Sequence, residues 1–183
     1  ADNPRKHEAW QVQVLASLCA QNFSEYLSLT KAYEQNTPEP SLLAWRARNL
    51  LEISVWAIYC AQSKENARAF YEDAGRDVIG VYDAFTKWGN ATSQDNDWLS
   101  PFDVAKQDIS QRAKSEGIET LGGAYQQVRN IAEKCGIGDH FRLSYKMLSK
   151  FAHPTAMLIM SAPDIEKEKL QKGDLVFFEG QRM

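Results

Sequence analysis

The sequence predicts an all-α fold, a multi-helix bundle of about six helices around a central apolar helix at residues 42–62. Two observations lead to this prediction. Apolar residues recur every three to four positions along most of the chain, whereas no useful stretch alternates with the two-residue period of a strand. Residues 42–62 are apolar on nearly every side, and a helix of that kind is buried by its neighbours.

Length and composition set the frame for the bundle. The 183 residues suit one domain with a tail, which we place at 1–162 and 163–183, the second part being polar. The net charge of −3 provides no overall basic field, so a protein that coats nucleic acid is disfavoured. The net charge does not exclude a local basic patch.

Capping residues and prolines predict where the first two helices begin and end. Asn3 and Pro4 are a capping side chain and a proline at the first helical position, so the first helix is expected to run from there to about residue 35. Residues 37–41 (TPEPS) stop it, and Ser41 is expected to cap the central helix.

A third helix is expected to open at Ser63 or Asn66 and to end at Gly89. Its apolar stripe is interpreted as core rather than as a platform for stacked bases. The residues on this stripe are Ala67, Phe70, Tyr71, Ala74, Val78, Val81, Phe85 and Trp88. The polar residues that follow Gly89 indicate a loop.

Glycines and prolines divide the second half of the chain. A fourth helix is expected at 101–116, after the cap Ser100 and before Gly117, and a short fifth helix is expected to end at Gly136. The fifth helix has its apolar residues at Tyr125, Val128, Ala132 and Cys135.

The sixth helix is expected to be capped by Asp139 and to break at His153, because the residue before a proline avoids the helical region. Its apolar face is expected to carry Leu143, Met147 and Phe151, with Leu148 nearby. Residues 156–160 are expected to be helical again, and residues 176–178 form a small apolar patch that needs a docking place.

The three cysteines, Cys19, Cys60 and Cys135, show no Cys-x-x-Cys or Cys/His grouping, so we expect free buried thiols and no metal site. We likewise expect no cofactor. No secretory signal is visible at the first residues, and no uncharged apolar run is long enough to span a bilayer. These features favour a cytoplasmic protein without a membrane segment.

Arg48 and Glu52 are four residues apart in the most apolar helix, so their side chains share a face. A charged pair is costly to bury there, and two interpretations stay open. The pair is either a structural ion pair or a device that orients the guanidinium toward a phosphate or carboxylate, with Tyr59 on the same face.

Tyr145, Ser149 and His153 recur every four residues on the sixth helix, opposite its expected apolar face. Arg142, Lys146 and Lys150 flank this row. The row is either a solvated surface or the floor of a site. In the second case His153, near the negative end of the helix dipole, is the candidate acid–base residue.

Two motifs, Arg48-x-x-x-Glu52 and Tyr145-x-x-Leu-Ser149-x-x-x-His153-Pro, resemble those of a bacterial family of helical proteins of unknown function. The resemblance covers about residues 10–165. It implies an all-helical fold in which Arg48, Glu52, Tyr145, Ser149 and His153 converge.

That family is loosely similar to the HEPN superfamily of helical bundles, many of which are metal-independent ribonucleases with an R-x4–6-H motif on a late helix. The present sequence departs from the motif, because Arg142 lies eleven residues before His153 and only Lys146 occupies the window of the missing arginine. If the activity applies, the resemblance implies that His153 is the base on a 2′-hydroxyl and that a cation steadies the phosphate.

Taken together, the sequence favours a binding or effector domain with a polar cleft for an anionic small molecule or a nucleic-acid phosphate. We expect Arg48 and His153 to carry any catalysis, and Glu52, Tyr145, Ser149 and Tyr59 to contact the ligand. Two alternatives remain. One is a HEPN-like endoribonuclease acting on RNA. The other is a non-catalytic interaction module, for which a homodimer interface could be formed by Trp45, Trp56 or residues 176–178.

Overall fold

A computed structural model describes residues 4–35, 38–92, 96–118, 121, 126–153 and 165–181. Within these ranges the chain forms seven helices and no strand, which confirms the all-α prediction. The helices are α1 (Pro4–Tyr33), α2 (Pro40–Gln62), α3 (Lys64–Ala91), α4 (Asn96–Ser115), α5 (Val128–Lys134), α6 (Gly138–Ala152) and α8 (Ile165–Gln181).

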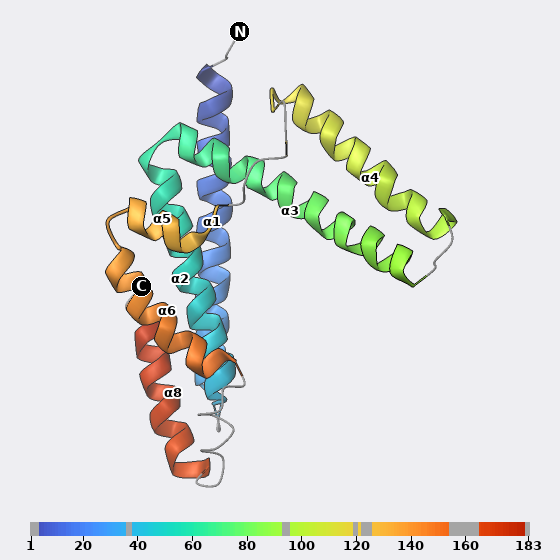
Figure 1. Cartoon of the computed structure of the whole chain (residues 1–183). Helices are drawn as coiled ribbons and strands as arrows, with labels where there is room; N and C mark the ends of the chain where they lie inside the picture. The colour runs from blue at the N-terminus through green and yellow to red at the C-terminus, as the bar shows by residue number, and fades with distance from the viewer. Residues whose placement is uncertain are drawn as a thin grey trace.

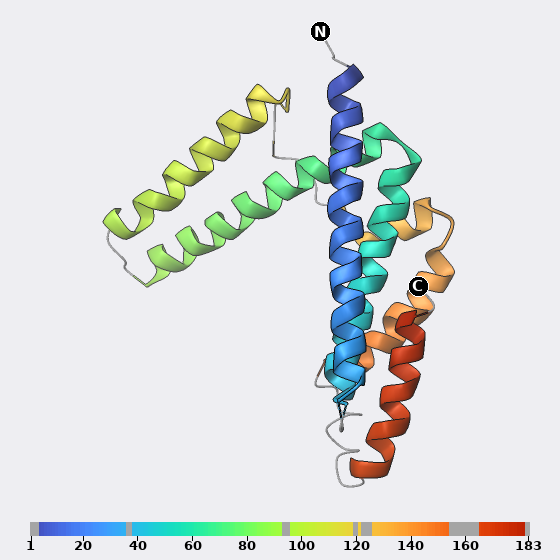
Figure 2. The ribbon, with the colours of Figure 1, turned by 180° about the vertical axis from the view of Figure 1, so that it is seen from behind.

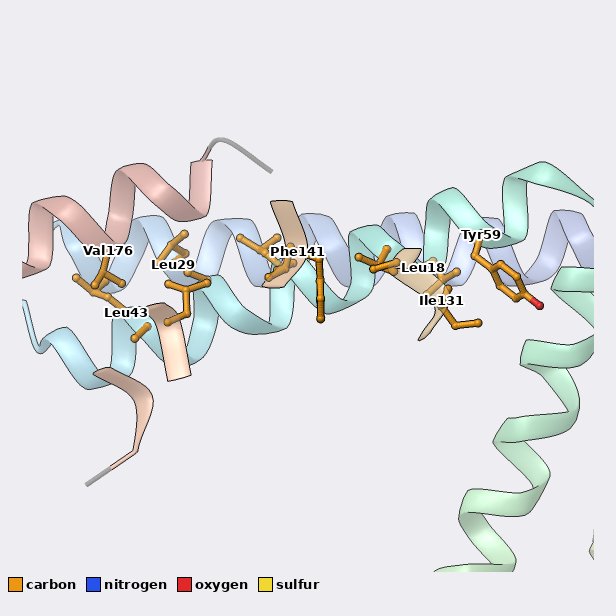
Figure 3. Packing of buried hydrophobic residues seen from close by; sticks show 14 of the residues in the cluster. Leu18, Leu29, Leu43, Tyr59, Ile131, Phe141 and Val176 are labelled. Atoms are coloured by element: carbon orange, nitrogen blue, oxygen red, sulfur yellow. The ribbon is translucent and has the colours of Figure 1, made fainter. Parts of the chain in front are cut away.

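Helix α2 is the centre of the bundle, as the sequence predicts. It contacts α1, α3, α5, α6 and α8, and α1 lies along it for most of its length (Figure 1). Figure 3 shows Leu43 of α2 with Leu29 of α1 and Val176 of α8 toward one end of the core, and Tyr59 with Ile131 toward the other. The all-round apolar character of α2 is therefore explained by neighbours on most of its sides.

The ends of α2 differ slightly from expectation. The helix begins at Pro40, after Glu39, and Ser41 lies inside its first turn rather than at the cap. Proline suits this position because its fixed φ and missing N–H cost nothing there. At the other end Ser63 accepts a hydrogen bond from the backbone N–H of Asn66, which confirms Ser63 as the cap of α3.

Helices α3 and α4 form an antiparallel hairpin that leaves the bundle at an angle, as Figure 2 shows. We call Ala74–Ala91 of α3 together with α4 the arm. Gly89 does not end α3, which continues to Ala91. A Cβ at Gly89 would lie 2.6 Å from Cδ2 of Leu99, so this glycine serves the close approach of α4. Helix α4 begins at Asn96 and contains Pro101.

The apolar stripe of α3 is core only near the bundle. Ala67 is fully buried, whereas Val78, Val81, Phe85 and Trp88 are between 41% and 53% exposed. The expectation that the whole stripe is core is therefore corrected. The physical reason is that α4 packs on α3 from one side, through rings such as Phe102 on Phe85, and α1 and α2 reach only the base of α3.

Glycines end α4 and α5 as predicted, with φ of +80° at Gly117 and +75° at Gly136. Helix α6 begins at Gly138, and Asp139 lies in its first turn without capping it. The buried face of α6 is also rotated from the expected one. Its buried residues are Phe141, Ser144 and Leu148, whereas Leu143 is 73% exposed.

Residues 165–181, within the segment expected to be a polar tail, form helix α8, which packs against α1 and α2. Val176 and Phe177 are buried, and the Phe177 ring stacks on Tyr33 with 3.8 Å between centroids. A Cβ at Gly180 would lie 2.8 Å from Cβ of Ala47, so the glycine lets α8 and α2 approach closely. Tyr125, Pro154 and the expected helix at 156–160 lie outside the described residues.

The residues expected to mediate a homodimer have different surroundings. Trp45 and Phe178 are exposed, whereas Trp56 packs on Phe70 and Val176 is buried. Cys60 is buried as expected, which raises the pKa of its thiol to about 12, whereas Cys19 is exposed and corrects the expectation that all three thiols are buried. Among the described helices none is long and apolar enough to cross a membrane.

Candidate functional site

The Arg48 side chain lies at the centre of a polar cluster between α2 and the end of α6. Its Nε donates to Glu52 Oε1 at 2.9 Å, one helical turn further along α2. The Arg48 side chain is 22% exposed and that of Glu52 32%, so the pair lies at the surface of the bundle. Water reaches both groups, and the desolvation penalty of a buried ion pair is largely avoided.

Tyr145 of α6 holds the guanidinium from the other side. The Arg48 Nη2 donates to the Tyr145 hydroxyl at 2.5 Å, and the guanidinium carbon lies 4.5 Å from the centre of the ring. On its other side the Tyr145 ring stacks on the ring of Phe141, with 5.1 Å between the ring centroids, and Phe141 is buried. The tyrosine is thereby fixed between a core aromatic and a cation, which limits its rotamers.

His153 completes the cluster from the position where α6 ends. Its backbone is extended, with φ −110° and ψ 152°, as the following proline demands. The Arg48 Nη1 lies 2.8 Å from His153 Nε2. A guanidinium can only donate, so a hydrogen bond at this contact has Nε2 as its acceptor and requires the tautomer with the hydrogen on Nδ1. We call Arg48, Glu52, Tyr145 and His153 the Arg48 cluster.

The Arg48 cluster retains several hydrogen-bond donors for a further molecule. Arg48 has five N–H groups and uses three of them in the contacts above, which leaves two without a partner among the described residues. The Tyr145 hydroxyl accepts from Arg48 and keeps its own hydrogen, and the His153 tautomer that accepts from Arg48 carries an Nδ1–H. These groups are donors on a half-exposed surface, and they suit the oxygen atoms of an anion.

Ser149 lies on α6 between Tyr145 and His153 but does not join their hydrogen bonds. Its Oγ is buried, and the described part of the chain offers it no hydrogen-bond partner. The backbone N–H of His153 donates to the carbonyl of Ser149, which closes the last turn of α6.

Tyr59 is not brought to the Arg48 cluster. It is buried, and its hydroxyl donates to Gln126 Oε1 at 3.3 Å. Desolvation by burial is the main reason that the pKa of Tyr59 is raised. Periodicity correctly places Tyr59 on the Arg48 side of α2, but it lies two turns beyond Glu52, about 10 Å along the axis.

Basic residues surround the cluster on the exposed side of α6. Lys146 and Lys150 are exposed and one turn apart, and Arg142 pairs with Asp139. They add local positive charge next to Arg48, whose own charge is partly balanced by Glu52. Among the described residues no group of three His, Cys, Asp or Glu side chains is arranged to hold a metal ion.

Sequence reasoning missed the support that Phe141 gives to Tyr145. The buried face of α6 follows Phe141, Tyr145, Leu148 and Ala152, a helical spacing of four, three and four residues that is visible in the sequence. This spacing puts Tyr145 at the border between the buried and exposed faces of α6. Such a border is where a half-buried site is expected.

Comparisons with known proteins give one match. A model of the family described as a family of unknown function, DUF5677, matches residues 14–168 and so includes every residue of the Arg48 cluster. No curated protein matches the chain, and no solved structure does.

Proposed function

The chain belongs to DUF5677, a family of unknown function, and we propose that it is a helical binding or effector domain whose Arg48 cluster takes an anionic ligand. The ligand binds through its oxygen atoms. It is either an anionic small molecule or a phosphate group of a nucleic acid, since both present the same oxyanion chemistry to an arginine.

One observation carries the proposal. A single guanidinium, on a side chain that is 22% exposed, is held in place by three side chains from two segments that are about a hundred residues apart in sequence. Glu52, Tyr145 and His153 fix the plane of the guanidinium and still leave N–H donors unused. A rigid arginine loses little side-chain entropy when a phosphate or carboxylate binds, and so it is prepared for that role.

The direct test is a binding titration with wild type and Arg48→Ala. Inorganic phosphate, a nucleoside monophosphate and a short single-stranded RNA are the probes, at constant ionic strength. Hydrogen bonds to a charged group contribute about 1.5–3 kcal/mol, so we expect the variant to bind at least about tenfold more weakly. The probe with the highest affinity identifies the source of the anion.

Arg68→Ala is the matched control. Arg68 also pairs with a glutamate one turn away, Glu72, lies over an aromatic ring, Trp10, and is similarly exposed. The control removes the same charge and the same kind of contacts at a distance from the cluster. Equal losses in Arg48→Ala and Arg68→Ala, or no binding of any probe by the wild type, would contradict the proposal.

A metal-independent, HEPN-like endoribonuclease is the second candidate. The observation in its favour is the 2.8 Å contact between Arg48 and His153, because α2 supplies in space the arginine that is missing from the R-x4–6-H window before His153. His153 Nε2 accepts a hydrogen bond from Arg48 in this arrangement. It can take a proton from a 2′-hydroxyl only after that bond opens.

An RNA cleavage assay distinguishes this candidate from simple binding. If the chain is such a nuclease, cleavage in the absence of divalent metal is lost in both His153→Ala and Arg48→Ala. Cleavage that both variants retain excludes the candidate. Binding without cleavage in the wild type leaves the binding domain as the function.

A further inference from the structure

The contact between Arg48 and His153 depends on the protonation state of the imidazole. Arg48 Nη1 lies 2.8 Å from His153 Nε2, which is hydrogen-bond distance. The guanidinium has donors only, so Nε2 can accept this bond only while it carries no hydrogen. An imidazolium carries a hydrogen on both ring nitrogens and has no acceptor to offer. Protonation of His153 and its hydrogen bond with Arg48 therefore exclude each other.

The His153 side chain is the part of this contact that can move. Two positive charges at this separation repel each other, and more strongly at a partly covered surface than in bulk water. The His153 ring is exposed and stands where α6 ends. Its backbone stays in place, because its N–H donates to the carbonyl of Ser149. The expected response to protonation is therefore a rotation of the His153 side chain away from Arg48 Nη1.

The Arg48 guanidinium keeps its position when the His153 ring moves. Its Nε stays bonded to Glu52 and its Nη2 to the Tyr145 hydroxyl. The guanidinium carbon lies 4.5 Å from the centre of the Tyr145 ring, and that ring is stacked on the buried Phe141. Two of the three supports of Arg48 are thus independent of the histidine. One more N–H donor, on Nη1, becomes available for a ligand while the guanidinium stays oriented.

The net charge of the Arg48 cluster changes with the same proton. With a neutral His153 the charges of Arg48 and Glu52 cancel each other. With a protonated His153 the cluster has an excess of one positive charge. An anion then meets two cations, the guanidinium and the imidazolium, and an oxyanion between them offsets their repulsion. Binding of the anion and binding of the proton therefore favour each other, and this coupling is reciprocal.

The other ionisable groups close to His153 belong to residue types that keep their charge near neutral pH. Arg48 and Glu52 face it from α2. On the last turns of α6 the ionisable side chains are those of Tyr145, Lys146 and Lys150. Histidine is the side chain whose charge normally changes between about pH 5 and 8. A change of anion affinity over that range is therefore expected to come from His153.

Helices α5 and α8 also pack on α6, but they bring their carboxylates to its beginning and middle. Glu133 of α5 lies against Gly138, and Glu179 of α8 accepts a hydrogen bond from Ser144. Ser144 is about 13 Å from His153 along the helix axis. At that distance an exposed charge is largely screened at physiological ionic strength.

We propose that His153 is a proton-dependent switch of the Arg48 cluster, an inference that rests on the proposed anion site. The neutral ring occupies Nη1 of Arg48. The protonated ring releases that donor and becomes the second cation of the site, so that the anion binds between the guanidinium and the imidazolium. When the anion binds to the neutral form, Nε2 takes up one proton from the solvent.

The affinity of the full chain for inorganic sulfate, measured at about pH 6 and about pH 8, tests the inference. These values lie within the range over which histidine changes its charge. Sulfate is the probe because its own charge is constant there, whereas phosphate gains and loses a proton near pH 6 to 7. Coupling between two binding events is typically about 5–150-fold, so we expect sulfate to bind at least about fivefold more tightly at the lower pH. Ionic strength is held constant, and circular dichroism checks that the chain is folded at both pH values.

Two substitutions of His153 separate its charge from its hydrogen bond. The amide oxygen of His153→Gln can accept from Arg48 Nη1, but the side chain takes up no proton, whereas His153→Lys is a cation at both pH values. Each variant is expected to lose the pH dependence, and His153→Lys to bind sulfate more tightly than His153→Gln. His140→Gln is the matched control, since His140 is exposed near the beginning of the same helix. It should keep the pH dependence of the wild type.

The possible failures distinguish this inference from the proposed function. Sulfate that binds through Arg48 with equal affinity at both pH values, or more tightly at pH 8, overturns the inference and leaves the proposed anion site in place. A pH dependence that His153→Gln retains, or that His140→Gln removes, has the same consequence. Sulfate that binds at neither pH, or binds equally well to Arg48→Ala, contradicts the proposed function and the inference with it.

Discussion

Leu148→Ala is expected to lower the free energy of unfolding by about 2–5 kcal/mol. Leu148 is fully buried on α6 and belongs to the same core cluster as α2 residues such as Leu51 and Val55. Truncation removes apolar contacts and leaves a cavity that the surrounding helices fill only in part. Because Tyr145 lies on the same helix and His153 directly follows it, we also expect anion binding at the Arg48 cluster to weaken.

Leu143→Ala is the control for this prediction, since Leu143 is on the same helix and 73% exposed. Its effect should stay within about 0.5 kcal/mol, as for most surface substitutions. Urea unfolding followed by circular dichroism measures both variants. If Leu143→Ala destabilises as much as Leu148→Ala, the face that α6 turns to the core is not the one described.

Val176→Asp is expected to destabilise the protein by at least about 3 kcal/mol. Val176 of α8 is fully buried in the core shared with α1 and α2. The substitution loses its apolar contacts and places a carboxyl group where the surroundings are apolar, and each effect costs stability. Thermal unfolding measures the loss, and release of α8 from the bundle is the expected structural result.

Phe178→Asp is the matched control on the same helix, because Phe178 is 57% exposed. We expect a change within about 0.5 kcal/mol. The comparison decides whether residues 165–181 are part of the bundle or a polar tail. If Val176→Asp leaves the stability unchanged, α8 contributes nothing to the stability of the bundle.

Local signals in the sequence predicted a large part of the fold. Helix α2 was visible because it is apolar all round, and the cap at Ser63 and the glycine ends at Gly117 and Gly136 depend only on neighbouring residues. The break at His153 was predictable for the same reason, since Pro154 acts on the residue before it.

The errors concern which neighbour covers which face. The period of α3 was correct, but periodicity cannot tell that α4 covers one side of the arm and leaves Val81 exposed. Likewise Leu143 was expected on the apolar face of α6, whereas Ser144 is buried there because its hydroxyl donates to Glu179 of α8. Burial of a serine requires a partner that only the tertiary structure provides.

The sequence predicted which residues form the candidate site, but not the contacts between them. Helical spacing put Arg48 with Glu52, and Tyr145 with His153, on common faces. The contact between these two pairs spans 105 positions and depends on the packing of α6 against α2, which no local pattern specifies. Tyr59 shows a second limit of helical spacing. It shares a face of α2 with Arg48, but residues on one face do not meet when they lie several turns apart.

The measurement that tests the Arg48 cluster most directly is a titration of the histidine side chains by NMR. The chain has three histidines, His7, His140 and His153, so their ring signals are few enough to assign. Inorganic phosphate, and then the probe that binds best, is added at constant pH and ionic strength. We expect a saturable shift of the His153 ring signals that Arg48→Ala abolishes, and unchanged signals for His140 at the other end of α6. Equal shifts at all three histidines, or none at His153 while the probe binds, would contradict the assignment of the Arg48 cluster as the anion site.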